Sequence, residues 1–229
     1  MRLPPLVVLG TLLLLAAIQP CLATDNQLTP EEKTAGWQLL FNGKDYTGWI
    51  CSNGKKIASP VEDGALVPYK SGGYIVVYQK DFSDFILKCD VKMGEQCNSG
   101  VFLRVSDLKR PVQNGFEIQV YNGKGTSYHD FGAIYDLVRP KKQLAKGPGQ
   151  WTSMQVTCRG PYISVSVNGE TVAEMNCDDF TEPGLRPDGT KHKFRRAVQD
   201  FARKGHLGFQ DHGHKVWFKN VKLLELKAK

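Results

Sequence analysis

The chain lacks any apolar run long enough to cross a membrane as a helix. Its longest run, Leu6 to Ile18, has thirteen residues (6 to 18 inclusive), whereas a spanning helix needs roughly 20. There is also no Cys-x-x-Cys pair, no Cys/His spacing typical of a zinc site and no glycine-rich dinucleotide motif after a strand pattern. Internal repeats and low-complexity linkers are missing too. These absences argue against a helical membrane protein, a zinc-binding module, a nicotinamide-dependent dehydrogenase and a repeat protein.

The N-terminal apolar run instead predicts a secretory signal peptide. Arg2 precedes it, and Pro20-Cys21-Leu22-Ala23 follows it, with small residues at the −3 and −1 positions for a cut after Ala23. A lipid anchor on Cys21 is the alternative, but Ile18-Gln19-Pro20 matches the expected small residues poorly. We therefore expect residues 1–23 to be removed and residues 24–229, a chain of 206 residues (229 minus 23), to form one exported domain. Whether export leads to the periplasm or the extracellular space depends on the host.

Basic residues outnumber acidic ones, which gives a formal net charge of +7. Loss of Arg2 lowers it to +6 (7 minus 1). The positive residues are scattered, apart from a cluster between Lys191 and Lys204, so a solvated surface is expected and nucleic acid is not an expected partner. The cluster itself predicts a short helix, because four apolar residues share a helical face and Gly205 follows the last basic turn. These four are Phe194, Ala197, Val198 and Phe201.

Five cysteines remain after processing, an odd number that allows at most two intramolecular disulfides. Export makes disulfides plausible, but the pairing is left open by the sequence. Cys89 and Cys158 fall on the apolar phase of strand patterns, so we expect them to be buried rather than nucleophilic. The five residues are Cys51, Cys89, Cys97, Cys158 and Cys177.

Most of the chain is a series of short β patterns separated by turns. Thr29-Pro30-Glu31-Glu32 predicts the start of a very short helix, and Asn168-Gly169 predicts a two-residue hairpin. About a dozen short strands without a composition break predict an all-β fold, a two-sheet β-sandwich of jelly-roll type with one or two short helices. The expected strands are 37–41, 65–67, 74–77, 85–93, 100–105, 116–120, 132–135, 151–158, 162–167, 171–176, 206–210 and 215–225.

Three of these strands alternate between an apolar and a polar side. In the clearest case Phe116, Ile118 and Val120 alternate with Glu117, Gln119 and Tyr121. The strands at 100–105 and 206–210 follow the same pattern. Because side chains of a strand point alternately to opposite faces, the pattern predicts a sheet with one face in the core and an outer face that carries titratable, amide and aromatic groups.

Several segments together resemble one known family. They are the opening GWQLLFNGKDYTGW, the central NSGVFLR, GFEIQVYN and GAIYD, the phrase GQWTSMQVTCRGPYISVSVNG, and the closing GHLGFQDHGHKVWFKNVKLLEL. In this order, from about Gly36 to Leu226, they resemble the 3-keto-disaccharide hydrolase domain family, formerly a domain of unknown function. The resemblance implies the concanavalin A-like sandwich of lectins and glucanases, and the strand pattern predicts a sandwich independently.

The resemblance also implies a substrate class and a reaction. Members act on glycosides whose C3 hydroxyl has already been oxidised to a ketone, which acidifies the hydrogen on C2. A base removes this hydrogen and the group at C1 leaves by elimination; water then adds back, or the enone is released and the enzyme is a lyase. This chemistry requires a base near C2, an electropositive group at the C3 oxygen and a proton donor at the leaving oxygen.

Glu117, His212 and Arg104 are the predicted catalytic residues. Glu117 lies mid-strand on the polar side, where an isolated charge has no structural purpose, so we favour a general base or a ligand over a solvated rim residue. His212 has an imidazole suited to proton transfer at neutral pH. Arg104 carries paired donors for a ketone oxygen, and an ion pair with Glu117 is its structural alternative. We expect the three groups to converge on one groove.

A further set of residues is predicted to bind the sugar. Gln119, Tyr135 and Gln210 are expected to bind hydroxyl groups, and Tyr121 to stack on a sugar face. His129 lies in the loop 123–131, and functional groups often gather on loops. The expected partner is therefore a sugar substrate, an oxidised disaccharide or glycoside.

No cofactor is required by the sequence pattern. Glu117, His212 and a loop aspartate offer ligands for a divalent metal, but no spacing demands one. A non-catalytic carbohydrate-binding module on the same scaffold is an alternative, since fold does not fix function. An ordinary glycosidase fits least, because it needs two carboxylates that flank the scissile bond.

Overall fold

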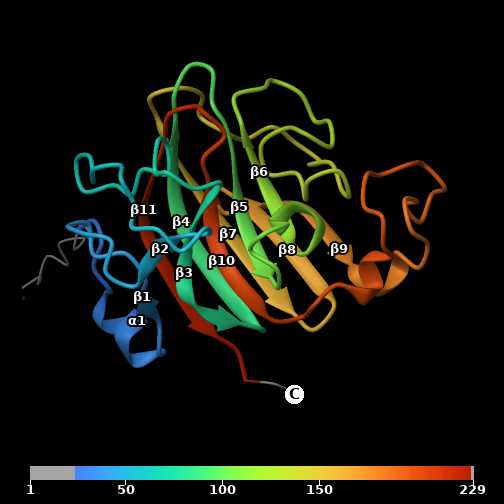
Figure 1. The fold of residues 1–229 in the computed structure, drawn as a ribbon, viewed down its shortest axis with the longest axis horizontal. Coiled ribbons are helices and arrows are strands. Elements are labelled where there is room, and N and C mark those ends of the chain that lie inside the picture. The colour runs from blue at the N-terminus through green and yellow to red at the C-terminus, as the bar shows by residue number, and fades with distance from the viewer. Residues whose placement is uncertain (1–23, 228–229) are drawn as a thin grey trace, which may run out of the picture.

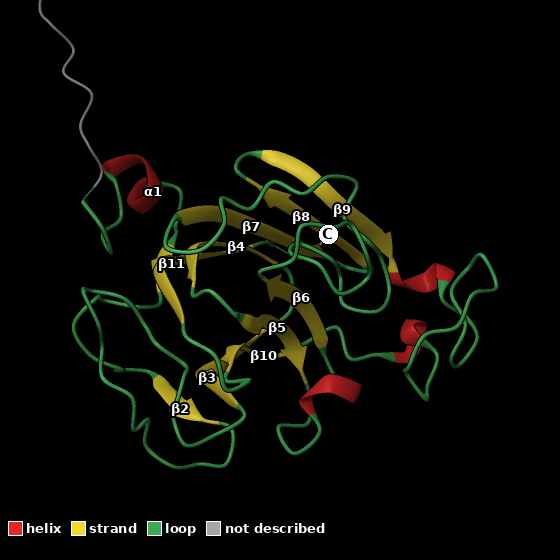
Figure 2. Cartoon of the chain, turned by 90° about the horizontal axis from the view of Figure 1, so that it is seen from above, coloured by secondary structure: helices red, strands yellow, loops and turns green. Residues whose placement is uncertain are grey.

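The computed structural model describes residues 24–227, which form two packed antiparallel sheets. The six-stranded sheet has the order β1 (Gln38–Leu39), β11 (Val216–Glu225), β4 (Phe85–Met93), β7 (Trp151–Arg159), β8 (Tyr162–Val167) and β9 (Glu170–Asn176). The five-stranded sheet has the order β2 (Trp49–Cys51), β3 (Ile75–Phe82), β10 (Gly205–Gln210), β5 (Asn98–Val105) and β6 (Phe116–Tyr121). Figure 1 shows the strands of both sheets, and Figure 2 shows the two layers. The predicted two-sheet jelly-roll sandwich is confirmed.

The first element is the predicted short helix, α1 (Pro30–Thr34). Thr29 caps it: the Thr29 hydroxyl accepts a hydrogen bond from the Glu32 backbone N–H, and the Glu32 carboxylate accepts one from the Thr29 N–H. The same carboxylate accepts a 2.6 Å hydrogen bond from Lys222 on β11. Glu32 therefore both caps the helix and attaches it to the six-stranded sheet.

The core lies between the two sheets, as the alternating patterns predict. Phe116, Ile118 and Val120 of β6 belong to it, together with Leu207 and Phe209 of β10. The other side of the five-stranded sheet carries the polar residues of the same strands. In the pairing of β5 with β6, Phe102 lies opposite Glu117 and Gly100 opposite Gln119, so these residues share the outer face.

The alternation fails near the end of β5. Arg104 has a φ of +51°, a left-handed conformation that is uncommon for a non-glycine residue. As a result Val105 joins Phe102 in a small apolar cluster outside the main core, although the sequence pattern placed it with Val101 and Leu103. This irregularity changes the location of the Arg104 side chain.

The helix predicted at the basic cluster is wrong. Only a single 3₁₀ turn, η3 (Val198–Asp200), forms there. The four apolar residues that suggested the helix are all buried, and Phe194, Val198 and Phe201 pack into the core from an irregular chain. Figure 1 shows this orange segment beside β9. Of the expected strands, 65–67 and 132–135 form only isolated bridges.

The five cysteines of residues 24–227 are all free and buried. The disulfides that the sequence allowed are therefore not formed in this part of the chain. Burial of Cys89 and Cys158 agrees with the strand pattern, and desolvation raises the pKa of both thiols. These cysteines stabilise the fold as small apolar residues.

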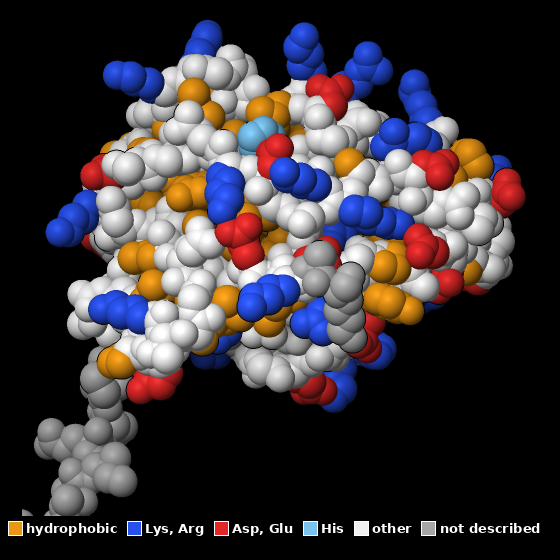
Figure 3. Space-filling view, turned by 90° about the horizontal axis from the view of Figure 1, so that it is seen from below, with side chains coloured by type: hydrophobic (Ala, Val, Ile, Leu, Met, Phe, Trp, Pro, Cys, Tyr) orange, Lys and Arg blue, Asp and Glu red, His pale blue; other side chains and the backbone are white. Residues whose placement is uncertain are grey.

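Two predictions concern membranes and export. Over the described range, no helix combines the length and apolar character that crossing a bilayer requires. The predicted signal peptide, residues 1–23, lies outside the described residues. Figure 3 shows lysine and arginine side chains interspersed with carboxylates over one face of the molecule, in keeping with scattered basic charge.

Candidate active site

A cavity of about 430 Å³ opens on the outer face of the five-stranded sheet. This volume falls in the range of roughly 300–1,000 Å³ that is usual for small-molecule sites. Strands β5, β6 and β10 supply its polar floor, and the loops that follow β6, β9 and β10 supply its walls. Its lining residues are Tyr74, Asn98, Val112, Glu117, Gln119, Tyr121, His129, Tyr135, Lys193, Gln210 and His212.

Glu117 is the buried acid of this cavity. Its side chain is on β6 and only 7% of the residue is exposed. Burial raises the pKa of Glu117 to about 7, while the charge of Lys193 and a hydrogen bond with Gln210 oppose the rise. A carboxyl group with such a pKa exchanges a proton readily near neutral pH. Glu117 is the one carboxylate among the lining residues within 24–227.

Gly100, on the neighbouring strand β5, has no side chain and so leaves space for the Glu117 carboxylate. A Cβ at Gly100 would lie 2.6 Å from Glu117 Cγ and closer still to Oε1. Real Cβ contacts of this kind do not occur, so any other residue at position 100 forces Glu117 to move. Gly100 thus belongs to the site although it has no functional group.

Gln210 and Tyr74 form a hydrogen-bonded pair beside Glu117. Gln210 Nε2 donates to the Tyr74 hydroxyl oxygen over 2.7 Å. Burial, together with the charge of Glu117, raises the pKa of Tyr74 to about 12, so the phenol stays protonated at neutral pH. Gln210 was expected here from its strand pattern, whereas Tyr74 was not, since sequence reasoning had placed it only in a strand.

Gln119 is fixed by the neighbouring strand and keeps a free acceptor. Its amide nitrogen donates to Asn98 Oδ1 (2.9 Å) and to the Ser99 carbonyl oxygen (3.2 Å). Its Oε1, like Oε1 of Gln210, is buried without a hydrogen-bond partner. Buried polar atoms are normally paired, so we interpret these two oxygens as the point where a bound hydroxyl group completes the network.

Lys193 is a site residue that sequence reasoning missed. It was assigned to the solvated face of a helix, but the helix is absent and its ammonium lies 3.7 Å from the centre of the Tyr135 ring. Desolvation lowers the pKa of Lys193, and the charges of Glu117 and Asp136 oppose this shift. A positive group is therefore present at the cavity that holds Glu117.

A network between two loops holds Lys193 in place. The Lys193 backbone N–H donates to Asp136 Oδ2 (2.8 Å), and the Arg186 guanidinium donates to Asp136 Oδ1 (2.7 Å). Arg186 also stacks on Tyr128, with its Cζ 3.7 Å from the ring centre. These contacts connect the loop after β9 to the loop after β6. Because the partners are far apart in the sequence, no local pattern predicts them.

The remaining predicted residues lie at the cavity rim. His212 comes from the turn between β10 and β11 and is exposed, and Tyr121 at the end of β6 is 41% exposed. His129 lies with its ring 4.9 Å from that of Tyr135, and its Nε2 is 3.7 Å from Asp136 Oδ1. Thus all the predicted site residues except Arg104 line one cavity.

Arg104 lies elsewhere, so the expected convergence of three catalytic groups is wrong for this residue. Its guanidinium is fully buried and donates to the carbonyl oxygens of Ser83 (2.7 Å) and Gly160 (2.8 Å) and to Asp84 Oδ1 (3.0 Å). The expected pair with Glu117 is absent. The positive φ at Arg104 turns its side chain towards the β3–β4 and β7–β8 turns, where it is structural.

The metal ligands proposed from the sequence do not assemble. Among residues 24–227 no three His, Cys, Asp or Glu side chains are close enough together to hold a metal ion. The aspartate of the loop 123–131, Asp130, is buried and accepts a hydrogen bond from the Ser127 N–H (2.7 Å). Asp130 shapes its own loop.

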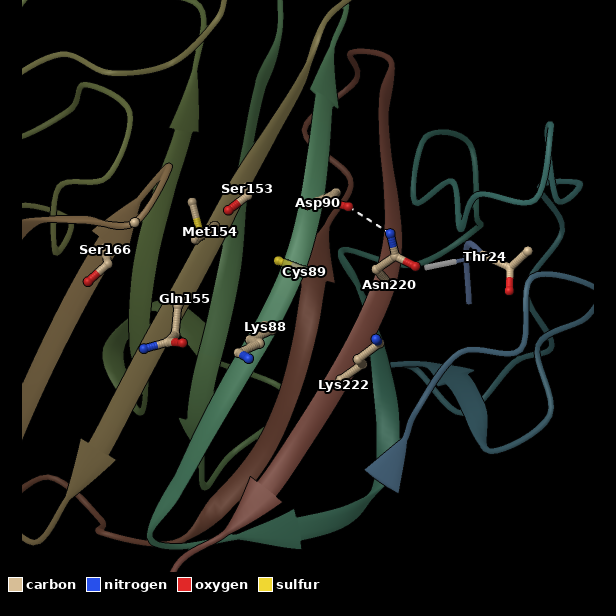
Figure 4. A pocket seen from close by; sticks show the side chains of 11 residues that line it. Thr24, Lys88, Cys89, Asp90, Ser153, Met154, Gln155, Ser166, Asn220 and Lys222 are labelled. Carbon is tan, nitrogen blue, oxygen red and sulfur yellow. Dashed lines mark hydrogen bonds between the residues drawn. The ribbon is translucent and has the colours of Figure 1, made fainter. Parts of the chain in front are cut away.

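A separate cavity of about 350 Å³ lies on the outer face of the six-stranded sheet (Figure 4). Asp90 accepts a 2.7 Å hydrogen bond from Asn220, Lys222 is paired with Glu32, and Lys88 lies 4.4 Å over the Trp37 ring. Polar side chains such as Gln155 and Ser166 project from neighbouring strands. Because it offers no buried, unpaired acid or base, this cavity is a weaker candidate for catalysis than the one around Glu117.

Fold and candidate site together point to a class: a β-sandwich enzyme with a polar cavity on the outer face of one sheet. Comparison with known proteins makes this specific. The model of a family described as 3-keto-alpha-glucoside-1,2-lyase-like domain matches residues 36–224. The chain belongs to this family, and the resemblance drawn from its motifs is confirmed.

Individual relatives agree with the family. A 3-keto-disaccharide hydrolase of Bacteroides thetaiotaomicron is 22% identical over 225 residues, which cover 82% of this chain and 78% of that protein. A solved Parabacteroides distasonis structure, described as a candidate glycosyl hydrolase, is 32% identical with a TM-score of 0.74, covering 89% of this chain and 100% of that one. A second such structure from the same species is 28% identical with a TM-score of 0.72, covering 83% and 99%. These relatives support assignment to the glycoside hydrolase class of enzymes.

Proposed function

We propose that this chain cleaves the glycosidic bond of 3-keto-glycosides, with Glu117 as the base that removes the C2 proton. The observation that carries the proposal is a buried carboxyl group with a pKa of about 7 in a polar cavity of about 430 Å³. The base draws its proton from a carbon made acidic by the neighbouring ketone, so its pKa should lie near the working pH. Family membership and the named hydrolase relative support the substrate class.

The other roles follow from what surrounds Glu117. Proton removal at C2 creates an enolate, and negative charge develops on the C3 oxygen. Lys193 supplies the positive charge there, the role for which Arg104 was first considered. His212, at the rim, donates a proton to the oxygen of the leaving group, and Gln119 and Gln210 hold sugar hydroxyls on the floor. Water then adds to the enone, or the enone leaves unhydrated.

An ordinary glycosidase mechanism is disfavoured by the same geometry. It requires a second carboxyl group across the scissile bond, and Glu117 is alone among the residues of 24–227 that line the cavity. The elimination needs one carboxylate only.

Two substrates and one variant test the proposal. Purified mature protein should cleave a 3-keto-disaccharide, leave the unoxidised parent intact and exchange the C2 hydrogen of the keto-sugar in deuterated water. Glu117→Gln should lower the cleavage rate by about 100-fold or more, since general bases contribute roughly 10²–10⁴-fold, with unchanged circular dichroism. Binding of both sugars without turnover would indicate a carbohydrate-binding module instead. Cleavage of the parent would indicate an ordinary glycosidase.

We further propose that the enzyme works outside the cytoplasm, after removal of residues 1–23. The motif around Ala23 supports this. The N-terminal residue of protein purified from its host should be Thr24. A retained Met1 would contradict export, and a lipid on Cys21 would contradict cleavage after Ala23.

A further inference from the structure

A second, larger cavity adjoins the one that holds Glu117. It measures about 580 Å³ and shares two lining residues, Tyr74 and Val112, with the first cavity. A substrate whose sugar ring lies over Glu117 can therefore continue past these two side chains into the second cavity. Its other lining residues are Lys109, Arg110, Pro111, Gln113, Asn114, Arg195 and Arg196.

The segment that forms one wall of this cavity is firmly held. Leu108 and Val112 pack onto the outer apolar cluster that contains Phe102, and the short turn η1 (Pro111–Gln113) lies between the strands β5 and β6. Asn114 Nδ2 donates to the carbonyl oxygen of Arg110 (3.0 Å). This segment is thus anchored on the sheet rather than projecting freely into solvent.

The opposite wall is attached to the first by a single glutamine. Gln113 Oε1 accepts a hydrogen bond from the Arg195 backbone N–H (3.2 Å), and its Nε2 donates to the Lys193 carbonyl oxygen (3.5 Å). The bonds hold Arg195 close to the loop that carries Arg110. They also connect this cavity directly to Lys193 of the active site.

The cavity is strongly basic. Four cationic side chains line it, and no ion pair joins any of them to a carboxylate within residues 24–227; they are Lys109, Arg110, Arg195 and Arg196. No acidic residue is among the lining groups. The nearest acid along the chain, Asp107, accepts a hydrogen bond from the Lys109 backbone N–H (2.9 Å). By contrast Arg104, Arg186 and Arg203 each have an aspartate partner.

We propose that this cavity binds the leaving group of the glycoside and favours leaving groups that carry a carboxylate. The inference rests on the proposed function and adds a specificity to it. Guanidinium groups bind carboxylates through paired donors, and the apolar side chains of Tyr74, Pro111 and Val112 suit the ring of a sugar or an aromatic unit. A simple solvated basic face would need neither the cavity nor its continuity with the Glu117 site.

Two substrates that differ only in charge test this. They are the 3-keto-glucosides of 4-hydroxybenzoate and 4-hydroxybenzamide, whose leaving groups have similar shapes. The ratio of kcat/KM for the acid over the amide should fall about tenfold in the double variant Arg110→Gln/Arg195→Gln, because two favourable charge interactions are lost. Neither side chain makes a hydrogen bond or ion pair in the structure, so folding should be preserved. Lys44→Gln, which removes a charge outside both cavities, should leave the ratio unchanged.

A measurement without turnover separates this inference from the proposed function. By NMR titration, 4-hydroxybenzoate should bind the wild-type protein more tightly than 4-hydroxybenzamide, and the double variant should lose the difference. High salt should also weaken the preference. Cleavage of both glycosides with the same ratio in wild type and double variant would overturn the carboxylate subsite. Failure to cleave either glycoside would instead contradict the proposed function.

A matched pair of keto-disaccharides that end in glucuronate or glucose shows whether a sugar acid is preferred in the same way.

Discussion

Glu117 combines burial with nearby positive charge, and its titration should govern the rate. A base must be deprotonated to act, and the pKa of Glu117 is raised to about 7. We therefore predict that the acidic limb of the kcat/KM profile for a 3-keto-glycoside has an apparent pKa near 7, while loss of the proton from the proposed acid His212 lowers the rate at higher pH. A pH–rate profile measures this directly. A rate that is already constant down to pH 5 would show that a group with an ordinary carboxyl pKa, or none, acts as the base.

Lys193 offers a second prediction at the scale of single residues. Lys193→Met should lower kcat on the order of 100-fold, as loss of one electrostatic contact to a developing oxyanion does elsewhere, with a smaller change in KM. Lys191→Met is the matched control, because Lys191 is exposed on the same segment and does not line the cavity. Equal effects of the two substitutions would assign Lys193 a general electrostatic role. Lys193→Arg should recover part of the rate.

The sequence predicts individual site residues well where a strand carries them and poorly elsewhere. Glu117, Gln119 and Gln210 could be placed because a period of two fixes the face of each residue. The same rule misplaced Arg104. The positive φ of this residue breaks the two-residue alternation of the strand, and no glycine in the sequence marks the position. Lys193 could not be found either, because its position depends on Asp136 and Arg186, which are distant in the sequence.

At the scale of elements, the contact between β5 and β6 sets the geometry of the acid. Gly100→Ala should displace the Glu117 carboxylate and reduce kcat/KM by about 10- to 100-fold, with a loss of about 1–3 kcal/mol in the free energy of unfolding. Urea unfolding and kinetics on the same preparation separate the two effects. Gly94→Ala, whose Cβ would lie 3.0 Å from the Lys215 carbonyl oxygen, measures the cost of crowding away from the site. Wild-type activity in Gly100→Ala would show that the Glu117 position is not critical.

Elements also show why one helix prediction succeeded and another failed. At α1 the capping residues lie within four positions of one another, so the sequence contains the whole signal. Between residues 191 and 205 the apolar spacing fits a helix, but Phe194, Val198 and Phe201 each pack into the core from an irregular chain. Tertiary packing therefore overrides the local pattern, as it does for many short segments.

For the whole molecule, the free cysteines give a further prediction. All five cysteines in the described part are buried, and burial raises the pKa of Cys51, Cys97 and Cys177 as well as that of the two strand residues. Native mature protein should therefore react slowly or not at all with a thiol reagent, and five thiols should react after unfolding in denaturant. Fewer than five would reveal disulfides. A rapidly reacting thiol in the native state would contradict the burial of that residue.

The two-sheet architecture could be predicted because it follows from features distributed along the entire chain. Turn dipeptides, strand lengths and alternation all agree, so errors at 65–67 and 132–135 did not change the class. The order of the strands within each sheet had no such signal, since it depends on which strands meet across long connections. For that reason the strand residues of the candidate site could be placed on one face, whereas Lys193 and Tyr74, which also line the cavity, could not be foreseen.

The anchoring of Lys193 and Arg195 on loops has a consequence for how new specificities arise. Most of the core between the two layers comes from the strands, whereas Lys193 and Arg195, which line the two cavities, lie on the connection between β9 and β10. Changes in this connection would alter which glycosides the proposed leaving-group cavity accepts, while Glu117, the proposed base, stays fixed on its strand. Related enzymes on this scaffold would then differ in substrate specificity before they differ in reaction mechanism.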